Sequence, residues 1–222
     1  MASGRLGRFL GVCLLLTGGV GASVLATAGT AQAVVCGTAI AAGTPCTLTG
    51  TLGVLAGSLT LTSPTALAWS TTGSGVDQQI VDPTVAHQSY LVDDATGSGA
   101  GWHVTVTATT FTTGTVTLPN ATTFVTTGSV TSEAATTAPT AACSSGSTCT
   151  LPTDTTTYPV AITTAPSAPL SFTIYDTAAA TGLGSITIGI GALPVGWWVN
   201  VPANTKIGTY TSTISLTLIS GP

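Results

Sequence analysis

Residues 102–111 read WHVTVTATTF, a run in which apolar and polar side chains alternate. Successive side chains of an extended chain point to opposite faces. Trp102, Val104 and Val106 therefore share one face, and the intervening threonines share the other. Valine and threonine are β-branched and favour strands. The run predicts a β-strand with one buried face and one face covered by hydroxyl groups.

The same two-residue period recurs along the chain. No segment keeps apolar residues at the spacing of an amphipathic helix, and Gly, Pro, Ser and Thr interrupt the pattern roughly every 8 to 12 residues. The clearest expected strands are 102–111, 172–175, 186–190 and 210–219, with weaker ones at 47–55, 59–62, 67–70, 89–92, 114–118, 124–130, 158–162 and 195–201. Many short strands separated by turns predict an all-β fold: an antiparallel β-sandwich of immunoglobulin-like or Greek-key style with threonine-rich exposed faces.

These threonine-covered faces bear on association between molecules. They keep the surface polar without supplying charge, so copies of the chain do not repel one another. Edge strands that nothing covers can then pair between molecules. We therefore expect self-association, and a self-assembling surface-layer or fibre subunit is one function that this surface favours.

The chain begins with the features of a secretory signal peptide. Arg5 and Arg8 precede the apolar run 9–20, and residues 31–33 (AQA) supply a cleavage site. A charged region, an apolar region and a small-residue site in this order are typical of a leader that is removed. We therefore expect residues 1–33 to be cleaved and the chain to be secreted.

The rest of the chain, 34–222, is expected to fold as a single domain. Proline and threonine are frequent at about 134–169, which we expect to be a loop-rich insert. No second apolar run reaches the roughly 18–20 residues that a membrane span requires. No span is therefore expected after cleavage of the leader.

Charge limits the classes of partner. The full chain has three Lys and Arg against seven Asp and Glu. Loss of Arg5 and Arg8 with the leader would leave Lys206 as the single cation. One lysine cannot neutralise a phosphate backbone or hold a surface of anionic lipids. No nucleic-acid partner is expected.

The cysteines indicate disulfide bonds. Of the five in the chain, Cys13 lies in the leader, which leaves an even number for an oxidising compartment. Four cysteines allow three pairings. The pairing Cys36–Cys46 with Cys143–Cys149 needs the least chain folding, and we expect it. A zinc site would need ligands from two distant segments without CxxC spacing and is not favoured.

The sequence offers little material for catalysis. His103 falls on the threonine face of its strand, and nothing in the sequence positions His87. No G-x-S-x-G motif singles out a serine as a nucleophile. We therefore expect a protein that is not an enzyme and that uses no cofactor or metal.

Asp93 and Asp94 form the one adjacent pair of carboxylates. Neighbouring residues of a strand point to opposite faces, which disfavours a shared proton. The pair is expected to cap the glycine-rich turn that contains Gly99 and Gly101. The alternative is a weak calcium site built from one of these carboxylates and loop carbonyl groups.

Tryptophan is the residue type best suited to binding sugars in this chain. Trp197 and Trp198 are neighbours in an expected strand, so one should face the core and the other should face outward. An outward ring can stack on a sugar. The other interpretation is that this ring packs beneath a loop or an edge strand. Our glycan-contact candidates are Trp102, Trp197 and Trp198, and Trp102 is also expected to anchor the core.

Two stretches resemble the signature motifs of WxL domains. Residues 91–106 (LVDDATGSGAGWHVTV) combine a strand that ends in acidic residues, a glycine-rich turn, and Gly-Trp at the start of the next strand. Residues 201–218 (VPANTKIGTYTSTISLTL) combine a Val-Pro turn, a Gly-x-Tyr entry and an alternating strand. The chain departs from the family at Val104, where leucine is typical, and at residues 216–218 (LTL), which lack the second tryptophan.

The resemblance implies a function. WxL-domain proteins are exported surface proteins of Gram-positive bacteria, and the domain is thought to hold them to the cell wall through peptidoglycan without a covalent bond. It implies a secreted chain at the cell surface whose partner is peptidoglycan or another wall polymer, with other surface proteins as further partners. The sequence contains no LPxTG sortase motif, and we expect attachment through folded surface.

Overall fold

The structure is a computed structural model. It describes residues 34–36, 39, 41–43, 45–118 and 124–222. The expected leader, 1–33, lies outside the described residues. The chain divides into two compact units, Met1–Gly53 and Val54–Pro222.

The described part of the first unit contains a short pair of strands. β1 (Val34–Val35) and β2 (Cys46–Thr47) pair in parallel. The disulfide Cys36–Cys46 joins their ends, with the two Cα atoms 5.1 Å apart. The predicted local pairing of these cysteines is confirmed.

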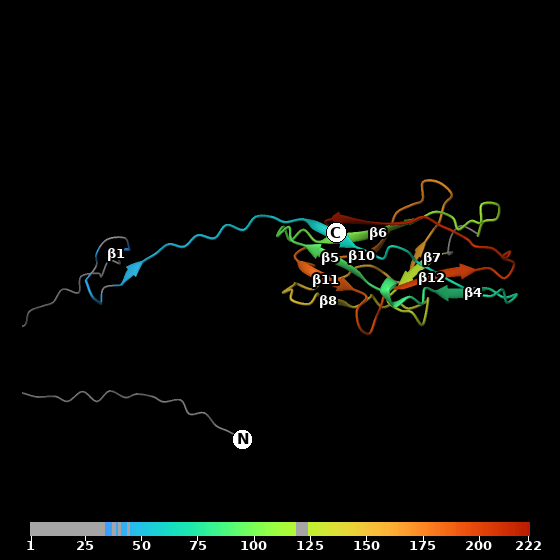
Figure 1. The fold of residues 1–222 in the computed structure, drawn as a ribbon, viewed down its shortest axis with the longest axis horizontal. Coiled ribbons are helices and arrows are strands. Elements are labelled where there is room, and N and C mark those ends of the chain that lie inside the picture. The colour runs from blue at the N-terminus through green and yellow to red at the C-terminus, as the bar shows by residue number, and fades with distance from the viewer. Residues whose placement is uncertain (1–33, 37–38, 40, 44, 119–123) are drawn as a thin grey trace, which may run out of the picture. The chain divides into compact units, whose positions relative to one another are not determined.

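Three antiparallel sheets make up the second unit (Figure 1). Their strand orders are β3-β5-β11-β8, β4-β12-β7-β9 and β10-β6-β13. The strands are β3 (Leu59–Thr62), β4 (Gln78–Val81), β5 (Tyr90–Asp94), β6 (Trp102–Ala108), β7 (Phe124–Thr127), β8 (Ala141–Cys143), β9 (Val160–Ile162), β10 (Phe172–Asp176), β11 (Gly184–Ile188), β12 (Gly196–Val201) and β13 (Ile214–Ser220). A 3₁₀ turn, η1 (Val85–His87), precedes β5. The predicted all-β sandwich is confirmed.

The core follows from the alternation in β6. Trp102, Val104, Val106 and Ala108 are fully buried, as their shared face predicts. They pack with Ile174 of the neighbouring strand β10 and with residues of the other two sheets, among them Val92, Ile162, Ile186, Ile188 and Trp197. The opposite face of β6 is less exposed than expected, because Thr105 is also buried. β6 is the central strand of its sheet, so its two neighbours shield the threonine.

β13 has the predicted two-sided pattern. Ile214, Leu216 and Leu218 are half-buried, whereas Ser215 and Thr217 are exposed. This strand is the edge of its sheet, so its outer face stays in water. The prediction of a threonine-rich exposed face holds here, on an edge strand.

Some expected strands are shorter than predicted or absent. The stretch 47–55 is paired only at its start, in β2, and 67–70 is not a strand. The stretch 114–118 makes only an isolated bridge, between Thr117 and Thr112. In 47–55 and 114–118 the alternating pattern is present, but the backbone lacks a neighbouring strand to complete the hydrogen bonds of a sheet.

Three strands were not expected from the sequence: β1 in the first unit, and β4 and β8 in the second. β8 lies in the stretch 134–169, and β9 lies there too. β8 pairs with β11 and ends at the second disulfide, Cys143–Cys149, whose predicted pairing is confirmed. Three residues are too few to show a period, so only the pairing partner reveals this strand.

In the part of the chain that the structure describes, we find no helix with the length and apolar composition needed to cross a membrane.

Candidate functional site

A groove of about 1020 Å³ opens on the second unit, between the stretches 64–76 and 202–213. Its floor carries Ile80 of β4, Val199 of β12 and Leu216 of β13. β4 and β13 are each the last strand of their sheet, so the groove lies where two sheet edges end. Core-facing side chains of both sheets therefore line a surface that water and ligands can reach.

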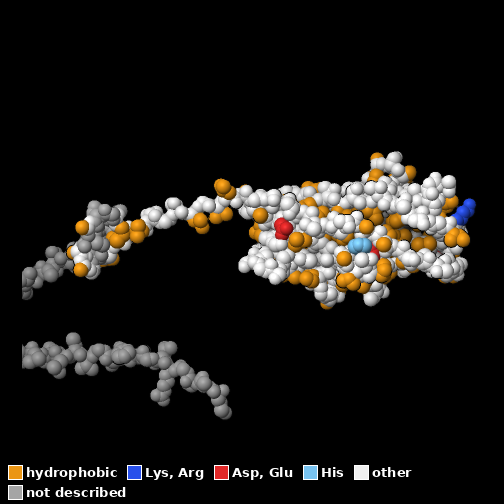
Figure 2. All heavy atoms as spheres, in the orientation of Figure 1, with side chains coloured by type: hydrophobic (Ala, Val, Ile, Leu, Met, Phe, Trp, Pro, Cys, Tyr) orange, Lys and Arg blue, Asp and Glu red, His pale blue; other side chains and the backbone are white. Residues whose placement is uncertain are grey.

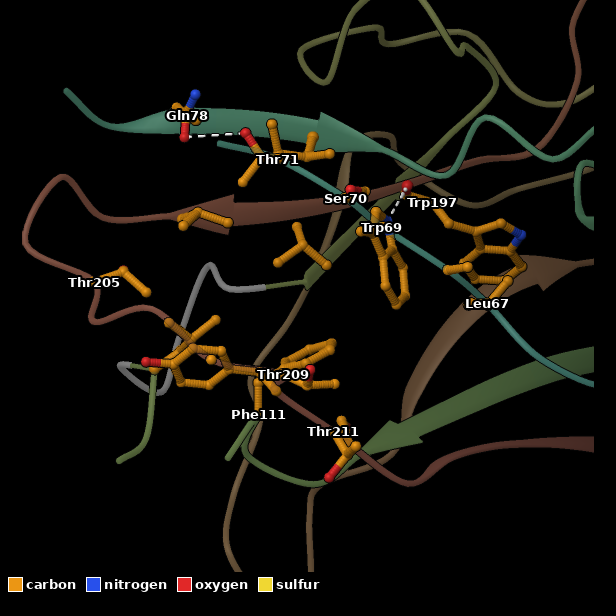
Figure 3. Close-up of a pocket in the computed structure, with 18 of the residues that line it drawn as sticks. Leu67, Trp69, Ser70, Thr71, Gln78, Phe111, Trp197, Thr205, Thr209 and Thr211 are labelled. Carbon is orange, nitrogen blue, oxygen red and sulfur yellow. Dashed lines mark hydrogen bonds between the residues drawn. The ribbon is translucent and has the colours of Figure 1, made fainter. Parts of the chain in front are cut away.

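Aromatic rings line the groove (Figure 3). Trp69 meets Phe111 edge to face, with ring centroids 5.7 Å apart and planes at 82°. The indole Nε1 of Trp69 donates to the carbonyl oxygen of Trp197 at 2.9 Å, which fixes the ring at the wall. Tyr210 is half-buried on the opposite wall, where its hydroxyl donates to the carbonyl oxygen of Lys206 at 3.0 Å. The two walls thus each hold an oriented ring.

Hydroxyl groups surround these rings. The lining includes Thr65, Ser70, Thr71, Thr72, Ser74, Thr205, Thr209, Thr211, Ser212 and Thr213. Each hydroxyl can both donate and accept a hydrogen bond. Among the residues that line the groove, Lys206 alone carries a charge. The groove therefore suits a long neutral molecule that is rich in hydroxyl and amide groups, with at most one anionic group beside Lys206.

The wall that carries Trp69 is fastened by a buried carboxylate. Asp82 is fully buried and accepts hydrogen bonds from the backbone N–H groups of Ala68 and Thr84, each at 2.8 Å. It also accepts one from Nδ1 of His87 at 2.7 Å. Burial raises the pKa of Asp82, but these hydrogen bonds outweigh it and hold the pKa below its ordinary value. The ionised carboxylate thus ties the groove wall to the end of β4.

His87 is therefore held in place, which the sequence alone did not indicate. Among the described residues, Asp82 is the hydrogen-bond partner of its ring. Its carbonyl oxygen accepts from Nε1 of Trp197 at 2.8 Å. The other histidine, His103, donates from Nδ1 to the carbonyl oxygen of Gly221 at 2.6 Å. Both histidines make contacts that hold neighbouring segments together.

The expectation that Trp197 or Trp198 faces outward is wrong. Their exposed fractions are 1% and 6%, and Trp102 is at 0%. β12 is an inner strand of its sheet, and Nε1 of Trp198 donates to the carbonyl oxygen of Ser129, in a loop that follows β7. The ring packs beneath this loop, as the other interpretation of the sequence has it. Of the three candidates, only Trp197 lines the groove, from below.

Trp69 and Tyr210 are the groove residues that sequence reasoning missed as contacts. Trp69 fell within an expected strand at 67–70, and Tyr210 was the first residue of the expected strand 210–219. Neither carries a local pattern that marks a binding site. The walls come together only because stretches more than 120 residues apart meet, as in the Ala203 N–H that donates to Asp77 at a separation of 126 residues.

The motif turn positions Trp102. Oδ1 of Asp94 accepts from the backbone N–H of Thr96 at 3.0 Å and from its hydroxyl at 2.7 Å. Gly99 and Gly101 have φ angles of 64° and 78°, which glycine adopts readily. The next residue, Trp102, donates its backbone N–H to the hydroxyl of Thr177 at 2.7 Å and its indole N–H to the carbonyl oxygen of Gly182 at 2.8 Å.

Asp93 lies in β5, opposite Ser185 of β11 and Thr60 of β3. Neither Asp93 nor the other turn residues line the groove. Within the described residues, no three His, Cys, Asp or Glu side chains form a group that could hold a metal ion. The contacts of the turn itself orient the start of β6.

Comparison with known proteins gives one match. The family model described as "WxL domain surface cell wall-binding" matches residues 61–222, well over half of the chain. No curated protein matches the chain, and no solved structure matches it. The match includes both motif stretches and both walls of the groove.

Proposed function

The chain belongs to the WxL family of surface, cell wall-binding domains, and from this membership we propose that it binds peptidoglycan strands non-covalently in the groove, without catalysis. The leader-like residues 1–33 and the family membership support secretion and retention at the wall of a Gram-positive cell. The single domain proposed for 34–222 would be exposed at that wall, with the groove as its contact surface.

The composition of the groove carries this proposal. Aromatic rings stack on the apolar faces of sugar rings, and hydroxyl groups pair with sugar hydroxyls and with acetamido groups. A net gain of about 0.5–1.5 kcal/mol per hydrogen bond is modest, so affinity requires several contacts along a chain. A groove with Trp69 and Tyr210 on opposite walls and hydroxyls along both supplies such a series. A polymer of repeating sugars matches it better than a compact metabolite does.

The arrangement of the titratable groups supports a non-catalytic role. Catalysis by general acids and bases needs such a group within reach of the substrate. Among the residues that line the groove, the titratable side chains are those of Lys206 and Tyr210. Asp82 and His87 are engaged with each other and with the backbone, behind the groove wall.

Charge placed on the exposed rim tests the groove directly. Val76 and Ile207 line the groove and are 64% and 106% exposed, so Val76→Asp and Ile207→Asp should leave the fold intact. Leu170 is 67% exposed and does not line the groove, which makes Leu170→Asp the matched control. We expect retention on purified peptidoglycan to fall about 10-fold or more for the two groove variants and to stay unchanged for the control.

Circular dichroism and thermal unfolding check that all three variants fold. Equal retention of groove variants and control would place wall binding elsewhere on the molecule. Retention of the unmodified protein no better than that of an unrelated secreted β-domain would refute peptidoglycan as the ligand. A hydrolase screen with turnover abolished by His87→Ala would overturn the non-catalytic assignment.

A further inference from the structure

An extended apolar stretch precedes the family domain. Leu48, Leu52, Val54 and Leu55 are exposed to 84%, 89%, 85% and 92%. Figure 2 shows apolar side chains along this thin length of chain. The stretch lies before residue 61, where the match to the family begins. Four large aliphatic side chains within eight residues are seldom left in water, so a partner surface is expected to cover them.

The sequence of this stretch is that of a strand. Residues 47–55 read TLTGTLGVL, which places Leu48, Gly50, Leu52 and Val54 on one face of an extended chain. β2 ends at Thr47, although the alternating pattern continues. Between the leader and Asp77 the chain carries no charged residue. Four of the nine residues are β-branched, and the stretch has no proline and no charge, which are features of segments that pair between molecules.

We propose that residues 47–55 pair antiparallel with the same residues of a second copy of the chain, about a two-fold axis through Thr51. In this register Leu48 lies opposite Val54 of the partner copy, and Leu52 lies opposite Gly50. This inference does not depend on wall binding in the groove.

Three features favour a second copy as the partner. The register is self-complementary, because each large Leu52 side chain meets the space above a glycine. The central Thr51 lies opposite its own copy, and such threonine pairs stabilise antiparallel strands. The absence of charge removes repulsion between identical segments. A two-fold interface requires the same surface on both copies to be complementary to itself, and this stretch meets that requirement.

A ribbon of two strands is marginally stable in water, so the association is concentration-dependent. Sedimentation velocity of the full chain, expressed in a secreting host, should show a dimer or larger species that grows with concentration. Leu52→Asp places two carboxylates in the ribbon, and we expect it to raise the dissociation constant about 10-fold or more. Leu52 is 89% exposed, so this change leaves the fold of the single chain intact.

Gly50→Val distinguishes pairing in this register from non-specific hydrophobic association. An added Cβ at Gly50 meets nothing within 4 Å in the single chain, so valine is tolerated there. In the proposed ribbon, valine collides with Leu52 of the partner copy and weakens association. If association rests on apolar surface alone, the added methyl groups strengthen it. A stronger association of Gly50→Val would overturn the register.

Cross-linking gives the sharpest test. Residues opposite each other in an antiparallel pair have Cα atoms about 4.5–5.5 Å apart, within the reach of a disulfide. Thr51→Cys should therefore link two copies under mild oxidation. In the same register two copies of residue 49 are four residues apart along the ribbon, about 13 Å, so Thr49→Cys should not link them.

The combined outcomes decide between partners. A linked Thr51→Cys dimer with no linked Thr49→Cys dimer supports the proposal. Equal linking of both variants, or a monomer at every concentration, overturns it. Association that persists in Leu52→Asp but is lost in Val76→Asp would assign the contact to the groove of a second copy instead. Peptidoglycan retention measured on Leu52→Asp stays at the unmodified level, which keeps this test distinct from that of wall binding.

Discussion

Asp82 shows how one residue can determine the shape of a binding surface. The carboxylate is fully buried and accepts hydrogen bonds from Ala68 in the groove wall and from Thr84 and His87 in the turn after β4. Burying a charge is costly unless hydrogen bonds replace its water. Here the donors replace it, and the groove wall that carries Trp69 is fixed as a result.

Removing this charge should loosen the wall. For Asp82→Asn we expect a loss of about 2–4 kcal/mol in the free energy of unfolding at pH 7, because the amide cannot accept from all three donors. Urea denaturation measures this change. If Asp82→Asn left the free energy of unfolding unchanged, the groove wall would be held by contacts other than those of Asp82.

The same residue predicts a pH dependence. The pKa of Asp82 is lower in the folded chain than its ordinary value of 3.8. Its contribution to stability is therefore present above that value and is lost as the pH falls through the lower folded pKa. We expect the stability difference between the unmodified chain and Asp82→Asn to shrink below about pH 4 in urea denaturation at several pH values. A difference that stays constant from pH 5 to pH 2 would contradict the assigned pKa shift.

Lys206 should determine the salt dependence of binding. It is the one charged residue that lines the groove, so it can contribute a single ion pair with an anionic group of the polymer. An exposed pair contributes about 0–1 kcal/mol and is screened by salt. For Lys206→Gln we expect at most about a 5-fold loss of peptidoglycan binding at low salt and no loss at 1 M salt. A large loss that persists at high salt would assign the lysine a different role.

At the scale of elements, the glycine turn between β5 and β6 decides where the core begins. Its φ angles are positive at Gly97, Gly99 and Gly101. Asp94 accepts hydrogen bonds at the start of the turn. Trp102, the first residue after the turn, is fully buried and stacks on Tyr175, with ring centroids 5.7 Å apart. The acidic and glycine residues of the motif therefore act together to direct one large ring into the core.

Two glycines of this turn make a matched test. Alanine at Gly99 or Gly101 adopts a positive φ angle at similar cost, about 1–2 kcal/mol. A Cβ at Gly101 would also lie 2.8 Å from the carbonyl oxygen of Thr177, whereas one at Gly99 has its nearest neighbour at 4.0 Å. We expect Gly101→Ala to lower the free energy of unfolding by about 1–3 kcal/mol more than Gly99→Ala does. Thermal and urea unfolding of both variants measure the difference, and equal effects would show that the turn moves to relieve the contact.

At the scale of the whole molecule, the chain combines a neutral body with two surfaces of different chemistry. The groove offers rings and hydroxyl groups at the ends of two sheets. The stretch 47–55 offers an uncharged strand ahead of the family domain. Charge is too scarce to direct either contact over a distance, so both depend on fit at short range.

Much of the fold was predictable because alternation is a local property. A strand places successive side chains on opposite faces wherever it lies, so the sequence revealed the faces of β6 and β13 without any partner, although both strands are shorter than the predicted 102–111 and 210–219. The same is true of the short disulfide loops, which close within 10 and 6 residues. The two motif stretches likewise belong to single turns and the strands that flank them.

Tertiary structure alone decided which strands are central and which lie at an edge. Because β12 is an inner strand, both Trp197 and Trp198 are buried. The stretch 47–55 has no partner strand beyond Thr47 and is exposed, whereas the short β8 forms because it pairs with β11. Tertiary structure also joined His87 to Asp82 and brought Trp69 to face a wall from the other end of the chain. These outcomes depend on pairing between distant segments, where backbone hydrogen bonds and shared apolar burial act, and a two-residue period carries no information about distance.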